Sequence, residues 1–201
     1  MSGRSKTPLR ARVRRALWFT AFAVMLAAGL GGSLSSATAA GSGCSDANAS
    51  ATRLSLAAAR DAVACLINQQ RGAHGLPPLA DSTRLSHSAQ SWANRLVARD
   101  AFDHGNFAAR VHAAGVNFSV AGENLATGQR TPAQVVRAWM ASADHCRNIL
   151  SPAYRELGTG VSPHPIRGYA NRPATWDDDF ALPIHHRAPS KNWAPANSCP
   201  Y

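Results

Sequence analysis

Apolar residues recur at helical spacing in the first part of the chain. In residues 53–71 they recur on one face of a helix, at Leu54, Ala58, Ala62, Cys65 and Leu66. This spacing predicts an amphipathic helix. A second helix follows the capping residues Asp81 or Ser82, and its apolar positions are Leu85, Ala89, Trp92 and Leu96. Residues 107–114 predict a shorter third helix.

The pattern changes toward the C-terminus. Thr131 followed by Pro132 starts a fourth helix, which ends in a polar exit over residues 142–151. Residues 116–128 contain too much glycine for a helix, and we expect a loop there. From Arg155 onward apolar and polar residues alternate, which predicts one strand there and another over residues 175–182. Helices thus precede strands, as in an α+β fold.

The N-terminus is typical of an export signal. A basic segment, residues 1–15, precedes an apolar run of 15 residues and the small residues Ala37-Thr38-Ala39. A membrane anchor is the alternative, but a span needs about 20 apolar residues. We therefore expect a signal peptide at residues 1–40 with no membrane span after cleavage, then a flexible linker at 41–52, a domain at 53–182 and a proline-rich tail at 183–201.

Composition and charge exclude two classes of protein. The chain is 45% hydrophobic and 16% charged, so it is not intrinsically disordered. Its formal charge is +10, but six of the 21 basic side chains precede residue 41, which leaves 15 against 11 acidic ones. The remaining basic residues are scattered, so nucleic acid is not an expected partner.

The four cysteines predict two disulfides in an oxidising compartment. Three pairings are open. We favour Cys44 with Cys65 and Cys146 with Cys199, which would fasten the C-terminal tail. Two alternatives carry less weight. Zinc binding by four thiolates lacks a Cys-x-x-Cys pair, and Cys146 beside His145 could be a nucleophile only without its disulfide.

Four titratable residues lie at the ends of predicted elements or in loops, where sites are usually built: His104, Glu123, His145 and Glu156. Two imidazoles with two carboxylates can hold a divalent cation or serve as general acid and base. Each residue also has an ordinary structural interpretation, such as a helix cap or an ion pair.

Seven short blocks occur in an order that resembles a known family. They are residues 65–71 (CLINQQR), 75–79 (GLPPL), 102–104 (FDH), 122–126 (GENLA), 139–142 (WMAS), 145–150 (HCRNIL) and 156–161 (ELGTGV). Together they resemble the bacterial branch of the CAP superfamily, which includes cysteine-rich secretory proteins, antigen 5 and pathogenesis-related proteins. The resemblance covers about residues 58–181.

The resemblance implies an α-β-α sandwich with a small antiparallel sheet between helices. It also implies a central cleft lined by four side chains, His104, Glu123, His145 and Glu156. Some relatives bind a divalent ion, often zinc, through the two histidines, so the implied metal ligands are His104 and His145.

Two positions depart from the family pattern. Asp144 stands where glycine is usual, and it could restrict the turn or add a carboxylate to the cleft. The late strand contains three consecutive aspartates between Trp176 and Phe180. Two of the three share a face of a strand. We expect them to form a solvated edge; a calcium site is the alternative.

Three functions are compatible with these observations. The leading one is a secreted module that binds a lipid, a cell-envelope component or an extracellular protein at the cleft. A metal-assisted hydrolase is the second, with Glu123 or Glu156 polarising water. The third is a disulfide-stabilised structural or adhesive protein. The chain contains no His-Glu-x-x-His or Gly-x-Ser-x-Gly motif, which weighs against the hydrolase.

Overall fold

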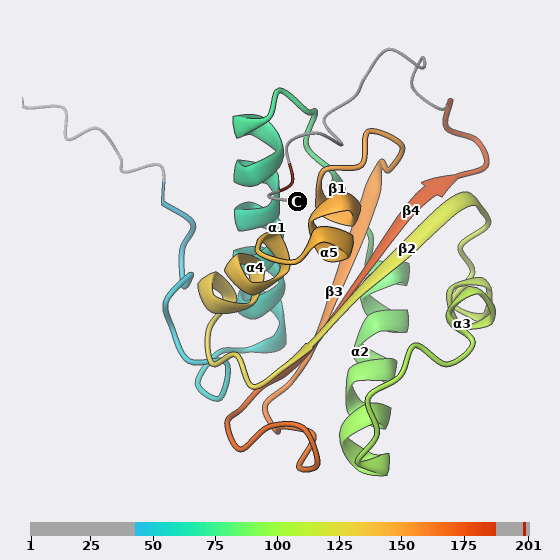
Figure 1. Cartoon of the computed structure of the whole chain (residues 1–201). Coiled ribbons are helices and arrows are strands. Elements are labelled where there is room, and N and C mark those ends of the chain that lie inside the picture. The colour runs from blue at the N-terminus through green and yellow to red at the C-terminus, as the bar shows by residue number, and fades with distance from the viewer. Residues whose placement is uncertain (1–42, 188–198, 200–201) are drawn as a thin grey trace, which may run out of the picture. The chain divides into compact units, whose positions relative to one another are not determined.

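A sheet lies between two layers of helices in the computed structural model, which describes residues 43–187 and residue 199 (Figure 1). Helices α1, α4 and α5 cover one face, and α2 and α3 lie on the other. This arrangement confirms the predicted α+β, α-β-α architecture. The elements are α1 (Leu56–Ala73), β1 (Ala80–Asp81), α2 (Thr83–Arg99), α3 (Phe107–Ala113), β2 (Phe118–Thr127), α4 (Pro132–Met140), α5 (Ala143–Ile149), β3 (Glu156–Ser162) and β4 (Thr175–Pro183).

The strand order is β1-β3-β4-β2. Strand β4 pairs antiparallel with β2 and β3, while the short β1 pairs parallel with β3. The prediction of a loop over residues 116–128 was wrong, because β2 runs through it. Its pairing with β4 extends from Phe118 opposite Pro183 to Thr127 opposite Thr175. A long partner strand thus stabilises a segment whose glycines disfavour a strand in isolation.

Thr131 starts α4 as predicted, and Ser82 is the N-cap residue of α2, although its side chain forms no cap hydrogen bond. Ser55 caps α1 by accepting a hydrogen bond from the Ala58 amide, and Thr131 caps α4 by accepting one from the Gln134 amide. The polar segment after α4, predicted as the irregular end of that helix, is a helix of its own. It forms α5, whose Cys146 and Ile149 are buried in the core. Seven residues leave too short a pattern for periodicity to be read from sequence.

Helix α2 lies directly on the backbone of β3. A Cβ atom added at Gly158 would be 2.1 Å from the Ser86 amide nitrogen, and one added at Gly160 would be 2.3 Å from the Ala89 carbonyl carbon. No side chain fits between the two backbones at these positions. The two glycines of the 156–161 block are therefore required by packing rather than by backbone conformation.

On the opposite face, a buried arginine joins α1 to α5. The Arg71 guanidinium is fully buried and donates to the carbonyl oxygens of Pro77, Ile149 and Ser151 at 2.7–2.9 Å. Burial, and then repulsion from Arg155, lower the pKa of Arg71 to about 10. The cation satisfies carbonyls that the ends of these elements would leave unpaired.

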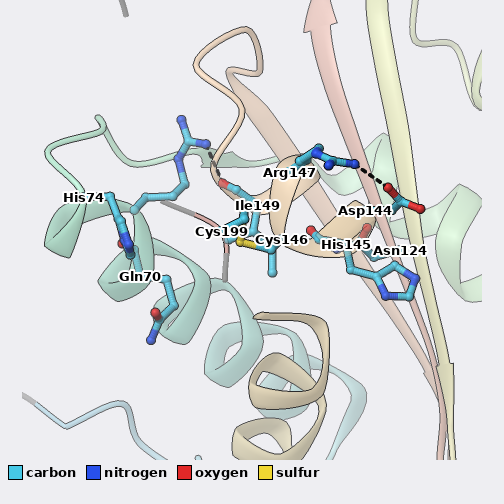
Figure 2. Close-up of a disulfide and its surroundings, with 10 residues drawn as sticks. Gln70, His74, Asn124, Asp144, His145, Cys146, Arg147, Ile149 and Cys199 are labelled. Atoms are coloured by element: carbon cyan, nitrogen blue, oxygen red, sulfur yellow. Dashed lines mark hydrogen bonds and ion pairs between the residues drawn. A yellow bond between two sulfur atoms is a disulfide. The ribbon is translucent and has the colours of Figure 1, made fainter. Parts of the chain in front are cut away.

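All four cysteines are paired, as Cys44–Cys65 and Cys146–Cys199. This is the favoured pairing, and the second disulfide joins residue 199 to α5 (Figure 2). Residues 43–52, predicted as a loose linker, form turns that contact the domain. The Ala51 amide donates to the Arg130 carbonyl, and the Ala47 carbonyl accepts from the Ala133 amide. The first disulfide ties these turns to α1.

The predicted signal peptide lies outside the described residues, as does most of the C-terminal tail. Within residues 43–187, no helix combines the length and apolar character that a bilayer span requires.

Replacement of Gly158 should destabilise the fold because α2 leaves no room for a methyl group. We expect Gly158→Ala to lower the free energy of unfolding by about 3 kcal/mol, the upper range for overpacked cores. Denaturant unfolding measures this. Gly72→Ala is the matched control, because Gly72 is exposed near the end of α1 with no atom within 4 Å of an added Cβ. It should raise stability by up to about 1 kcal/mol. Equal effects of the two changes would contradict the packing assignment.

Candidate functional site

Strand β2 lies at one edge of the sheet, and its residues 122–124 contact helices of both layers. Alternation along the strand directs Glu123 toward α3 and Asn124 toward α5. Gly122 makes space for this arrangement, since a Cβ atom there would be 2.3 Å from the Tyr154 hydroxyl oxygen. The Gly-Glu-Asn block thus connects the two helical layers through its side-chain contacts.

The Glu123 carboxylate links two side chains. Its Oε1 accepts from the Arg110 guanidinium, and its Oε2 pairs with Nδ1 of His104. Arg110 also donates to the backbone carbonyl of His104 at 2.6 Å and lies 4.0 Å from the ring centroid of Trp92. The Trp92 indole N–H donates to the Asp103 carbonyl at 3.0 Å. The loop that carries His104 is therefore held by Arg110 and Trp92.

His145 reaches the same region from the opposite layer. The Asn124 amide donates to the His145 carbonyl at 3.1 Å, and the Asn148 amide donates to the Asn124 side-chain oxygen at 2.8 Å. Figure 2 shows His145 on the side of Asn124, while Cys146 turns toward Cys199. Successive residues of α5 thus serve the site and the disulfide, which excludes Cys146 as a nucleophile.

Asp144 neither restricts the turn nor joins the buried site. Its side chain is 89% exposed and forms an ion pair with Arg147 at 2.7 Å (Figure 2).

The electrostatics favour a neutral His145 and an oriented His104. Partial burial, then repulsion from His104, lower the pKa of His145, while Asp144 opposes the change. Burial raises the pKa of Glu123, and Arg110 and then His104 oppose that rise. When the Glu123 carboxylate accepts a proton from Nδ1, the lone pair of His104 is on Nε2. A neutral imidazole with a free lone pair is the form that ligates a metal ion.

Glu156 lies elsewhere. It lines a cavity of about 400 Å³ together with Asp81, Arg84 and His185. In the sheet, Glu123 pairs with Asp179 of β4, whereas Glu156 pairs with Ala181, two residues farther along β4. The structure therefore brings together three of the four predicted cleft residues, His104, Glu123 and His145.

The three aspartates of β4 are not a solvated edge, and that prediction was wrong. All three are fully buried, because β4 is flanked by β2 and β3 and both faces are covered by helices. Asp177 and Asp179 share the face of Glu123, and one carboxylate oxygen from each of the three residues lies within 4.8 Å of the others. This buried acidic triad is geometrically able to hold a metal ion.

Burial dominates the titration of the triad. It raises the pKa of Asp177 well above the ordinary range, with repulsion from Asp179 as the second cause. It also raises the pKa of Asp179 from 3.8 to about 7, with repulsion from Glu123 as the second cause.

Sequence reasoning missed Arg110 and the role of Asp177 and Asp179. For Arg110 the sequence carries no signal, because one arginine on a short helix is ordinary. For the aspartates a signal existed. Trp176 and Phe180 enclose the run and are both fully buried, as expected of an interior strand.

Comparison with known proteins decides the family. The profile of the cysteine-rich secretory protein (CAP) family matches residues 65–177. The chain belongs to this family. Protein YkwD of Bacillus subtilis (strain 168) is 34% identical to this CAP protein over 120 residues, which are 57% of the chain and 44% of YkwD. The chain thus spans less than half the length of that relative.

Solved structures of bacterial proteins share the fold. An extracellular protein with an SCP domain from Bacillus anthracis str. Ames matches with a TM-score of 0.55 and 22% identity, over 64% of this chain and 44% of that one. An outer surface protein from Borrelia burgdorferi matches with a TM-score of 0.52 and 20% identity, over 59% of this chain and 87% of that one. These similarities support the α-β-α architecture of the CAP protein.

The raised pKa of Asp179 predicts that its contribution to stability depends on pH. The folded state holds the Asp179 proton more tightly than the unfolded state, so the protonated carboxyl stabilises the fold below pH 4. That contribution is lost as pH rises toward about 7. We therefore expect the stability gain from Asp179→Asn to grow between pH 5 and pH 7.5.

Chemical denaturation with a chelator present measures this gain, since bound cations would mask it. His145 titrates in both proteins, so its effect cancels in the difference. A gain that does not change with pH would contradict the assignment.

Proposed function

We propose that this CAP protein is a secreted binding protein that holds a divalent ion at His104 and His145, with zinc as the first candidate. The ligand that we propose for this site is a lipid, a cell-envelope component or an extracellular protein. The observation that carries the proposal is the Glu123 carboxylate, which holds His104 by its Nδ1 and is itself held by Arg110. Carboxylates that orient a histidine in this way are the usual outer partners of metal-binding imidazoles.

The donor set fits zinc. Imidazole nitrogen is a preferred ligand of Zn²⁺, and it ligates in its neutral form. The lowered pKa of His145 favours that form at neutral pH. Glu123 is only 6% exposed and bonds to Nδ1 of His104 from the protein interior, whereas the His104 side chain is 60% exposed. A bound ion would act as a Lewis acid toward an oxygen of the ligand.

Features of the sequence and the two disulfides support the extracellular part of the proposal. Residues 1–40 have the pattern of a signal peptide, and the two disulfides suit an oxidising compartment. The relative from Bacillus anthracis is an extracellular protein. We propose that the exported chain contains the CAP domain, with residues 43–52 packed on it, and a tail joined to α5 through Cys199.

Zinc titration of the disulfide-intact protein by calorimetry tests the site. We expect binding at pH 7.5 that is lost in His104→Ala and in His145→Ala and is weakened at pH 5.5, because protonated imidazoles cannot ligate. Glu123→Gln should weaken binding about 10- to 100-fold through the orientation of His104.

His74→Ala is the matched control. His74 lies at the end of α1, where its ring bonds to the Gln70 carbonyl, and its loss should leave zinc binding unchanged. Zinc binding that survives both His104→Ala and His145→Ala would overturn the proposed site. Zinc-dependent hydrolysis of peptide or ester substrates, lost in the same variants, would favour the hydrolase instead.

A further inference from the structure

The acidic triad lies behind the histidine pair, under helix α2. Glu123 of β2 and Asp179 of β4 are direct cross-strand neighbours, and Asp177 lies two residues away on the same face. The three side chains are at most 6% exposed, and one oxygen of each lies within 4.8 Å of the others. Three adjacent strand positions thus converge on one small buried volume.

A fourth polar group points into this volume from another element. Ser88 of α2 is 4% exposed, and its hydroxyl lies beside Asp179 without a hydrogen-bond partner of normal geometry among the described residues. The carboxylate oxygens of Asp177 and Asp179 also have no hydrogen-bond partner of normal geometry in that part of the chain, although the two side chains are close enough to interact with each other. Buried polar groups are normally satisfied, so five oxygens from two elements indicate a shared partner.

Arg110 cannot be that partner for all three acids. Its guanidinium bonds to Glu123 and to the His104 carbonyl, and it lies over Trp92. Its buried Nε has no hydrogen-bond partner among the described residues, so it does not bond to either aspartate. When all three carboxylates are ionised, they and one arginine carry a formal charge of −2 in a buried region. A divalent cation would neutralise that charge. A carboxylate has about four lone-pair sites, so Glu123 can still ligate an ion while it accepts from Arg110 and His104.

We propose a second cation site, which binds a hard divalent ion and for which calcium is the first candidate. Its ligands are the carboxylates of Glu123, Asp177 and Asp179 and the hydroxyl of Ser88. All of its donors are oxygen, the ligand that hard cations prefer. Two oxygens that are each about 2.4 Å from a calcium ion are at most about 4.8 Å apart, which the triad satisfies. Magnesium usually keeps several waters, so a buried site of protein oxygens favours calcium.

This site is separate from the proposed zinc site, although Glu123 contributes to both. Zinc would be held by imidazole nitrogens at the surface, and calcium by the oxygens beneath them. Variants of the aspartates and of the histidines therefore distinguish the two proposals, whereas a variant of Glu123 would not.

Calcium titration of the full, disulfide-intact chain tests the inference. After removal of metals with a chelator, CaCl₂ is added at pH 7.5, and binding is followed by calorimetry and by the thermal unfolding midpoint. We expect saturable binding that raises the midpoint, because the ion binds only the folded state. Asp177→Asn and Asp179→Asn should each weaken calcium binding about tenfold or more, because each removes one charged ligand.

Asp178→Asn is the matched control. Asp178 is equally buried in the same strand, but it projects to the opposite face, beside Thr159. Asp178→Asn, His104→Ala and His145→Ala should all retain calcium binding. Circular dichroism confirms that each variant is folded, and the two aspartate variants provide independent tests. The inference is overturned if the wild type binds no calcium, if both aspartate variants bind it normally, or if Asp178→Asn loses it equally.

Discussion

The close contact of α2 with the backbone of β3 is the constraint on which the site depends. Gly158 and Gly160 allow the helix to touch the sheet without intervening side chains. The same helix presents Ser88 and Trp92 to the neighbouring strands and to the loop that carries His104. Because α2 seals this face, the carboxylates of Asp177 and Asp179 are removed from water, and burial is the largest cause of their raised pKa values.

Strand β2 provides the second constraint, because an edge strand is accessible from both layers. Glu123 contacts residues that follow α2 on one face, while Asn124 holds α5 on the other. His104 and His145 are 41 positions apart and belong to opposite layers. They are near enough to interact electrostatically, and each is tied to one of two consecutive residues of β2 that project to opposite faces. The Gly-Glu-Asn block is thus the physical link between two halves of the site.

The three buried carboxylates of the triad differ in how well they are paired with basic side chains. Arg110 and His104 both bond to Glu123, whereas Asp177 and Asp179 have no hydrogen bond to either of these side chains in the described structure. An ionised carboxylate without a partner is costly to bury. The raised pKa values of the two aspartates are the direct consequence of this cost, because the neutral form avoids it.

The sequence by itself determined the helices with long apolar periodicity and the two disulfides, and it predicted His104, Glu123 and His145 as residues of one cleft. These features are local, or they are recorded in short blocks of residues. The tertiary structure alone decided that β2 is a strand, that Glu156 lies apart, and that Arg110, Asp177 and Asp179 join the site. Each of these depends on strand pairing or on burial by a distant helix. Such long-range contacts fix which face of a strand is covered, and no local pattern of residues specifies them.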